Sequence, residues 1–277
     1  MPPARRLNRI IKLLAAGLYW CALELRDAGL RCLGRRPPAR VTVIYYHQVK
    51  ADERARFAWQ MEHLRHWCKP IPAGHTGPLA SGRWVAVTAD DGWLSFAQNA
   101  LPEALSRAIP VTIFVIAGHL GDSAPPVPDC EGDRLLSGAE VAALSGPMVT
   151  IGCHTLSHRL IPGLSHAEAW RELALARPPL EACSGAPVDL FAFPFGECDG
   201  PSLELCRQAG YRRAFSGLPQ AAMREPAEFL SGRVRVDPDN WRLEFHLKAV
   251  GGYAWVGRAI QLRRRLRARL AKPPISP

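Results

Sequence analysis

The feature that most constrains the fold is an apolar run that ends in two adjacent carboxylates. Residues 85–88 read Val-Ala-Val-Thr, and Ala89 leads directly into Asp90, Asp91 and Gly92. Apolar and β-branched residues that stop at a glycine are typical of a buried strand ending at a turn. Two like charges side by side are costly at such a place unless something binds one of them. The turn is therefore a candidate functional site, with a solvated Asp-Gly turn as the alternative.

A second strand-like segment ends in histidine. Residues 149–153 form a short β-rich run, His154 follows it, and His158 comes four residues later. Two histidines at this spacing can direct their imidazoles toward one point if the backbone between them is helical or tightly turned. Together with one aspartate they form a candidate metal site with open coordination positions, as hydrolytic chemistry requires. A His/His/Asp set accepts Zn²⁺, Co²⁺ and Ni²⁺, so it does not by itself select the metal.

Three segments resemble the motifs of the NodB-type polysaccharide deacetylases, carbohydrate esterase family four. Thr88–Gly92 is similar to their T-F-D-D-G motif, His154–His158 to H-[ST]-x-x-H, and Phe191–Gly196 to the F-x-Y-P-Y-G variant of the third motif. The resemblance extends from about Val41 to Trp255. It implies an α/β fold, a distorted (β/α) barrel of about seven parallel strands. It also implies a metal-dependent hydrolase that removes acetyl groups from an N-acetylated glycan or a glycan-lipid intermediate.

The resemblance assigns a role to each motif residue. The metal ligands it implies are Asp91, His154 and His158. The bound ion is a divalent metal, with Zn²⁺ expected, and Asp90 is the catalytic base. The oxyanion site is implied at Pro194, Phe195 and Gly196, with the backbone N–H of Phe195 as the donor.

The chain also departs from the family pattern. Ala89 replaces the usual phenylalanine of the first motif, and the arginine that often begins the third motif and pairs with the base is absent. Arg233 and Arg235 are the candidates to supply its charge. The missing arginine, together with the unclear source of the general acid, motivates an alternative function, a non-hydrolytic glycan-binding protein with a deacetylase-like fold.

The general acid needs a separate source. The family's C-terminal L-x-H motif has no clean match, and the nearest histidine is His246, after Phe245. One branch of the family carries Y-H-x-V on its first strand, which Tyr46–Val49 matches. That resemblance implies that His47 is the acid, while a structural histidine at a strand end is the alternative. An imidazole with a pKa near neutrality is suited to protonate a leaving amine.

The positive charge belongs to the two ends of the chain. Of a formal net charge of +10, residues 1–40 and 251–277 contribute sixteen Lys or Arg and only two acids, whereas residues 41–250 hold nineteen basic and twenty-three acidic residues. We therefore expect a basic and apolar helix with its linker over 1–40, a catalytic domain over 41–250 and a basic helix over 251–277. Because the core is acidic, no nucleic-acid partner is expected.

The N-terminal segment allows two interpretations. The uncharged run Leu13–Leu23 is too short to cross a bilayer, which needs about twenty apolar residues. The apolar residues that fall near one helical face are Leu7, Ile10, Ile11, Leu14, Leu18 and Leu25. This pattern fits a helix lying on anionic lipid, and equally a helix packed on its own domain. Eight cysteines without a C-x-x-C favour a reducing compartment, hence a cytoplasmic protein with peripheral membrane association.

The order of elements predicts how the site is assembled. Strands are expected over 41–46, 85–89, 111–116, 149–153, 190–193, 212–216 and 233–236, and the helices between them include 95–107, 137–144 and 201–209. Loops are expected over 70–82 and 125–133. This alternation indicates a parallel sheet with crossover helices, which places the candidate residues together at the carboxyl ends of the strands.

Overall fold

A parallel sheet is the centre of the computed structural model, which describes residues 3–123, 132–225 and 227–270. Its strands are β1 (Ala39–Tyr46), β2 (Lys69–Pro70), β3 (Gly82–Ala89), β4 (Val111–Val115), β5 (Val149–Cys153), β6 (Leu190–Ala192), β7 (Arg213–Ser216), β8 (Leu230–Gly232) and β9 (Val234–Arg235). The hydrogen-bonded order is β8-β7-β6-β5-β4-β3-β1-β9, and β2 pairs with β3 beside this path. Each of these pairings is parallel, as the alternation of elements predicts.

One extended segment joins the two ends of the sheet. β8 pairs with β7, β9 pairs with β1, and Arg233 alone separates β8 from β9. The sheet therefore returns to its own first strand and forms a nearly closed barrel. If β8 and β9 are counted as one interrupted strand and β2 is set aside, the ring has seven strands. The predicted (β/α) barrel is confirmed.

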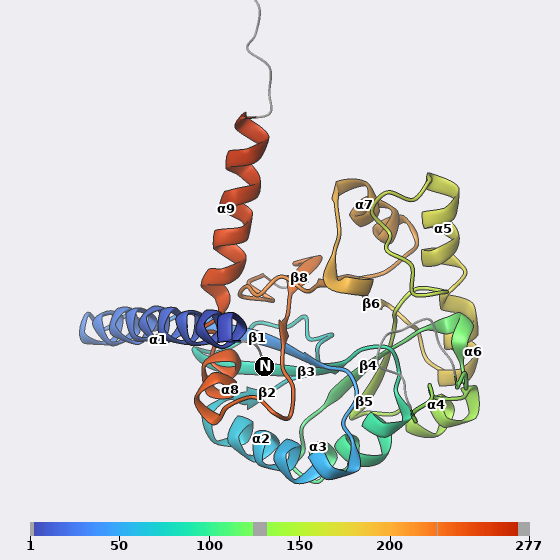
Figure 1. Ribbon diagram of the computed structural model, residues 1–277, viewed down its shortest axis with the longest axis horizontal. Helices are drawn as coiled ribbons and strands as arrows, with labels where there is room; N and C mark the ends of the chain where they lie inside the picture. Colours follow the sequence, from blue (N-terminus) through green and yellow to red (C-terminus); the bar gives the residue numbers. More distant parts are fainter. Residues whose placement is uncertain (1–2, 124–131, 226, 271–277) are drawn as a thin grey trace, which may run out of the picture.

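Most helices lie around the outside of the sheet, while α1 extends to one side of it and α9 projects away from it (Figure 1). The helices are α1 (Pro3–Cys32), α2 (Arg54–Trp67), α3 (Leu101–Leu105), α4 (Gly138–Leu144), α5 (His166–Ala174), α6 (Arg177–Ser184), α7 (Gly200–Gln208), α8 (Arg242–Ala249) and α9 (Ala254–Leu270).

α4 and α5 begin at reciprocal Ser/Glu capping boxes, which fix their starting points. The helix predicted over 95–107 is split, because a π-helical turn over Phe96–Ala100 precedes α3. Most of the loop predicted over 125–133 falls outside the described residues. None of the described helices is both long enough and apolar enough to span a bilayer.

Apolar side chains fill the lower part of the barrel and leave its mouth for polar groups. The interior cluster includes Val43, Ala86, Phe114 and Phe215. Gly152 is required here, since a Cβ on it would lie 2.5 Å from the ring of Phe114. Side chains two residues apart on a strand share a face. The face that begins with Ala86 therefore continues through residue 88 to residue 90, at the mouth.

Candidate active site

A polar cavity of about 660 Å³ lies at the carboxyl ends of the strands. The predicted site residues that line it are His47, Asp90, Asp91, His154, His158, Phe195 and Gly196. Pro194 is buried and is not one of the lining residues. Segments that are far apart in the sequence thus meet in one cavity, as the strand order predicts.

Asp91, His154 and His158 form the candidate metal centre. One ligand atom from each residue lies within 4.8 Å of the others, and all three side chains are buried. Asp91 Oδ1 is 3.4 Å from His154 Nε2 and 3.3 Å from His158 Nε2. Asp91 takes up a left-handed conformation (φ 70°), which aspartate tolerates better than most residues. The two carboxylates of the turn consequently point in different directions.

The protonation states of these side chains suit metal binding. Burial lowers the pKa of His154 to about 4, so its imidazole is neutral near neutral pH. Its Nδ1 lies 2.8 Å from the carbonyl oxygen of Ala192, which accepts the ring N–H and leaves the Nε2 lone pair facing the centre. Burial alone would raise the pKa of Asp91. The contacts of Oδ1 with the imidazoles of His158 and His154, at 3.3 and 3.4 Å, outweigh this effect and hold the pKa well below its usual range.

The donor set fits a divalent cation. Trp93 Nε1 donates to Asp91 Oδ2 at 3.0 Å, whereas the buried Oδ1 makes no hydrogen bond within the described residues. A buried carboxylate oxygen without a donor is expensive unless a cation satisfies it. Two imidazoles and one carboxylate leave further coordination positions open, which is the pattern of a catalytic rather than a structural site.

Glu172 shapes the loop that carries both histidines, and sequence reasoning did not identify it. Its buried carboxylate, on α5, accepts hydrogen bonds from the backbone N–H groups of Leu156 and Ser157 at 3.1 and 2.9 Å. It also accepts one from the Ser157 hydroxyl at 2.5 Å. The turn reverses the chain tightly, with His158 at φ 60°. The two histidines converge because the backbone between them is turned, one of the two conformations that their spacing allows.

Asp90 is paired with Arg233 rather than with the metal centre. The guanidinium donates to both carboxylate oxygens, at 2.6 and 2.8 Å, and both side chains are almost fully buried. The Arg233 guanidinium carbon also lies 4.5 Å from the ring centre of Tyr45 and 5.3 Å from that of Phe114. Arg233 comes from the break between β8 and β9, so the residue that closes the barrel also supplies the positive charge beside Asp90.

The other two predicted candidates lie elsewhere. Arg235 is exposed at the rim of the cavity and pairs with Asp237 at 3.3 Å. His246 lies on α8, outside the cavity lining, where its Nδ1 is 3.0 Å from Nε2 of His63. Its ring also packs edge-on against Trp67. His246 is therefore a packing residue between helices, which removes it as an alternative acid for this site.

His47 follows β1 at the cavity mouth. β1 and β3 pair in parallel with Tyr46 opposite Ala89, so His47 and Asp90 leave adjacent strands at the same level. The Nδ1 atom of His47 is buried and makes no hydrogen bond within the described part of the chain. His47 is one of the residues that line the cavity, and the sheet neighbourhood predicted for it is confirmed.

The third motif forms a strained turn at the edge of the cavity. Phe195 has a left-handed conformation (φ 58°), which is rare for a bulky residue and costs of order 1–3 kcal/mol. Its ring is 62% exposed and stands 5.0 Å from that of His158. Gly196 is needed because a Cβ on it would lie 2.4 Å from the backbone of Gly217. This close contact holds the Phe195 backbone at the cavity edge.

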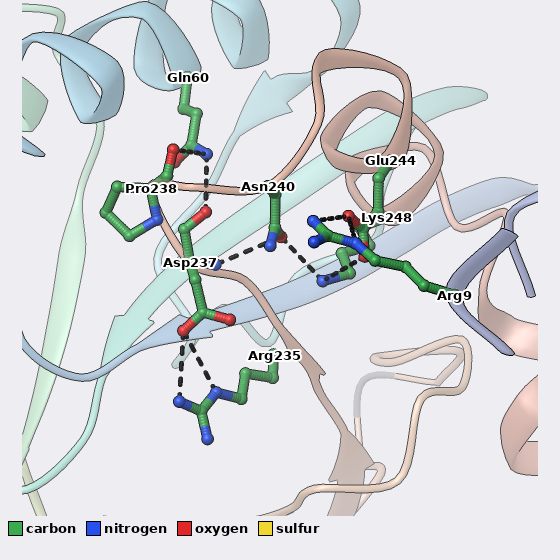
Figure 2. A network of polar contacts seen from close by, with 8 residues as sticks. All are labelled: Arg9, Gln60, Arg235, Asp237, Pro238, Asn240, Glu244 and Lys248. Atoms are coloured by element: carbon green, nitrogen blue, oxygen red, sulfur yellow. Dashed lines mark hydrogen bonds and ion pairs between the residues drawn. The ribbon is translucent and has the colours of Figure 1, made fainter. Parts of the chain in front are cut away.

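A polar network fixes the opposite rim, which follows β9 (Figure 2). The side-chain amide of Gln60 donates to the carbonyl oxygen of Asp237 at 3.0 Å. Asn240 Oδ1 accepts from the Asp237 backbone N–H at 3.3 Å and from Lys248 Nζ at 2.8 Å. Lys248 in turn lies 3.4 Å from Glu244 on the same helix. The rim is thus tied to α2 and α8 rather than left as a free loop.

Comparison with known proteins agrees with the site geometry. Residues 80–214 match the family model described as polysaccharide deacetylase. The Bacillus subtilis (strain 168) protein YxkH is 22% identical over 213 residues, which is 73% of each chain.

Solved structures agree as well. IcaB from Ammonifex degensii superposes with a TM-score of 0.64 and 26% identity, over 77% of this chain and all of IcaB. The Streptococcus pyogenes deacetylase PplD, solved with acetate, has a TM-score of 0.63 over 77% of this chain and 99% of PplD, and at 16% identity it shows the shared fold alone. By its barrel, its motif order and the match over residues 80–214, this chain resembles the polysaccharide deacetylases.

Proposed function

We propose that this protein is a metal-dependent hydrolase that removes acetyl groups from an N-acetylated glycan or a glycan-lipid intermediate. The observation that carries the proposal is the division of labour between the two adjacent carboxylates. Asp91 faces two histidines, while Asp90 is held by the buried guanidinium of Arg233 in the same cavity. The open cavity of about 660 Å³ has room for sugar units on either side of an acetamido group.

In this proposal Asp91, His154 and His158 hold a divalent metal, with Zn²⁺ as the expected ion. When bound, such an ion lowers the pKa of its water toward about 7 and polarises the acetyl carbonyl. The Ala192 carbonyl fixes the tautomer of His154, and Glu172 fixes the turn that brings His158 to the centre.

The remaining steps fall to the chain's own groups. Asp90, oriented by Arg233, takes the proton of the attacking water. The backbone N–H of Phe195, at the strained turn, donates to the oxygen that becomes negatively charged as the tetrahedral centre forms. His47 gives a proton to the amine as the C–N bond breaks.

A glycan-binding protein that does not hydrolyse its ligand remains the second candidate. The arginine missing from the third motif is one reason for this alternative. Arg233 lies beside Asp90, where that arginine would pair with the base. The pairing therefore favours the hydrolase.

Acetate release with and without a chelator tests the proposed function. On a panel of N-acetylated chitooligosaccharides, the metal-loaded protein should release acetate, the chelated protein should not, and added Zn²⁺ should restore release. Metal binding without acetate release from any glycan of the panel would favour the binding protein. Acetate release that is indifferent to chelation would refute the metal-dependent hydrolase.

Replacing His47 by alanine tests the acid. We expect the metal content to stay unchanged and amide hydrolysis to fall about 10²-fold or more, the usual contribution of a positioned acid. Hydrolysis of an activated aryl ester should fall much less, because its leaving group needs no proton. Amide hydrolysis near the wild-type rate would show that His47 is structural.

The ends of the chain complete the proposal. We infer a catalytic domain over 41–250 with accessory helical segments over 1–40 and 251–277, and a cytoplasmic protein attached peripherally to anionic membrane. The cysteines at 68, 153 and 206 support a reducing compartment, because they are buried free thiols and burial raises their pKa.

A further inference from the structure

Helix α1 packs on the domain through one side only. Ala16 is fully buried with Val234, Leu247 and Tyr253, and Trp20 packs beside it. Arg9 Nε donates to Glu244 at 2.8 Å, which joins α1 to the network of the cavity rim (Figure 2). Farther along the helix, the buried Asp27 pairs with Arg40 at 3.1 Å, and Glu24 pairs with Arg83, also at 3.1 Å. Hydrophobic contacts and ion pairs therefore hold the inner side of α1 in place.

The outer side of α1 carries an exposed apolar stripe. Residues three or four positions apart share a helical face, and the exposed ones here are Leu7, Ile10, Ile11, Leu14, Leu18 and Leu25. Leu14 is 64% exposed, Leu18 75% and Leu25 74%. Small exposed residues, Cys21 and Ala22, continue the stripe between Leu18 and Leu25. Contiguous exposed apolar surface of this kind marks an interaction site rather than ordinary surface.

The charges beside the stripe indicate what covers it. Arg6, Lys12 and Arg31 are exposed on α1, and Arg35 and Arg36 follow it, whereas the exposed Arg26 pairs with Asp27 at 2.7 Å. The acidic residues of α1, Glu24 and Asp27, are both engaged by arginines of the domain. The free surface of the helix is therefore apolar and cationic, which complements an anionic lipid surface. A second copy of the chain would bring a like-charged helix to the same face.

We propose that the outer face of α1 is the docking surface for an anionic lipid bilayer, with its leucines in the headgroup region and its cations at the lipid phosphates. This inference deepens the peripheral attachment proposed above and is independent of hydrolysis. It also reconciles the two interpretations of the N-terminal segment, since one side of the helix packs on the domain and the other meets lipid. Because α1 is tied to the cavity rim through Arg9 and Glu244, the docked helix holds the catalytic cavity close to the membrane surface.

Vesicle flotation of the full-length protein tests the proposal. The wild type should float with vesicles that contain phosphatidylglycerol, should float less with pure phosphatidylcholine, and should be released substantially by high salt. The double variant Leu14→Glu, Leu18→Glu should lose about tenfold or more of its binding. The matched control, Leu105→Glu with Leu175→Glu, makes the same changes at exposed leucines away from α1 and should bind like the wild type.

Each outcome separates this inference from its competitors. Equal binding of the double variant and the control, or no binding by the wild type, would overturn it. A dimer in light scattering that the double variant dissociates, without vesicle binding, would show that the face meets a second copy instead. Acetate release from a soluble oligosaccharide, measured on the same samples, reports separately on the proposed hydrolysis and should not change in the double variant.

Discussion

Replacing Asp90 by asparagine should leave the metal site loaded and reduce acetate release by about 10²–10⁴-fold, the usual contribution of a positioned base. The amide is nearly isosteric and still accepts a hydrogen bond from Arg233, so the cavity keeps its shape. It cannot take a proton from water. Metal content by elemental analysis and the initial rate of acetate release, measured on one preparation, check both halves of the prediction.

The same variant should be less stable than the wild type. Arg233 is 1% exposed, and breaking a buried ion pair costs about 3–5 kcal/mol because one charge is left uncompensated. Thermal unfolding should therefore be followed beside activity, at a temperature where the variant is folded. Asp239→Asn is the matched control, since this carboxylate lines the same cavity but is exposed, and its acetate release should stay within a few-fold of wild type. An equal loss of acetate release in Asp239→Asn would mean that the rate depends on the negative charge of the cavity rather than on a catalytic base at Asp90.

Alanine at Asp91, His154 or His158 should abolish both metal binding and acetate release. Each variant removes one of the three ligands that we propose, and the remaining two would not hold a divalent ion at micromolar supply. Equilibrium dialysis with Zn²⁺ measures the first effect and the glycan assay the second. His166→Ala, at an exposed histidine of α5 outside the cavity, is the control and should bind metal normally. A single alanine variant that kept full metal affinity would remove that residue from the ligand set.

Local sequence patterns predicted the parts of the site that lie at strand ends. The Asp90-Asp91 turn and the histidine pair each follow an apolar strand, and parallel pairing brings such ends to one edge. His47 was placed beside Asp90 for the same reason. The parallel sheet followed from the alternation of strands and helices, and the resemblance to the polysaccharide deacetylases implied that the sheet forms a barrel.

The residues that complete the site could not be chosen from the sequence, because their positions depend on how the barrel closes and how the helices pack around it. Arg233 and Arg235 are two residues apart, and only the break between β8 and β9 decides that Arg233 points inward while Arg235 stays exposed. Glu172 acts from a helix beside the histidine loop, and its local sequence gives only a weak signal. The weak signal that existed was its place on the inner face of the amphipathic α5. The sequence does not show which face of α1 is buried, because that depends on the packing of α8 against one side of the helix.

The most direct test of the account compares the metal content of Asp90→Asn and Asp91→Asn, because the central claim is that adjacent carboxylates divide the roles of base and ligand. Both variants are purified under the same conditions, loaded with Zn²⁺, dialysed and analysed for metal and for acetate release. The account predicts that Asp90→Asn retains about one metal ion and is nearly inactive, whereas Asp91→Asn loses the metal. An empty site in Asp90→Asn together with a full site in Asp91→Asn would reverse the assignment and contradict the account.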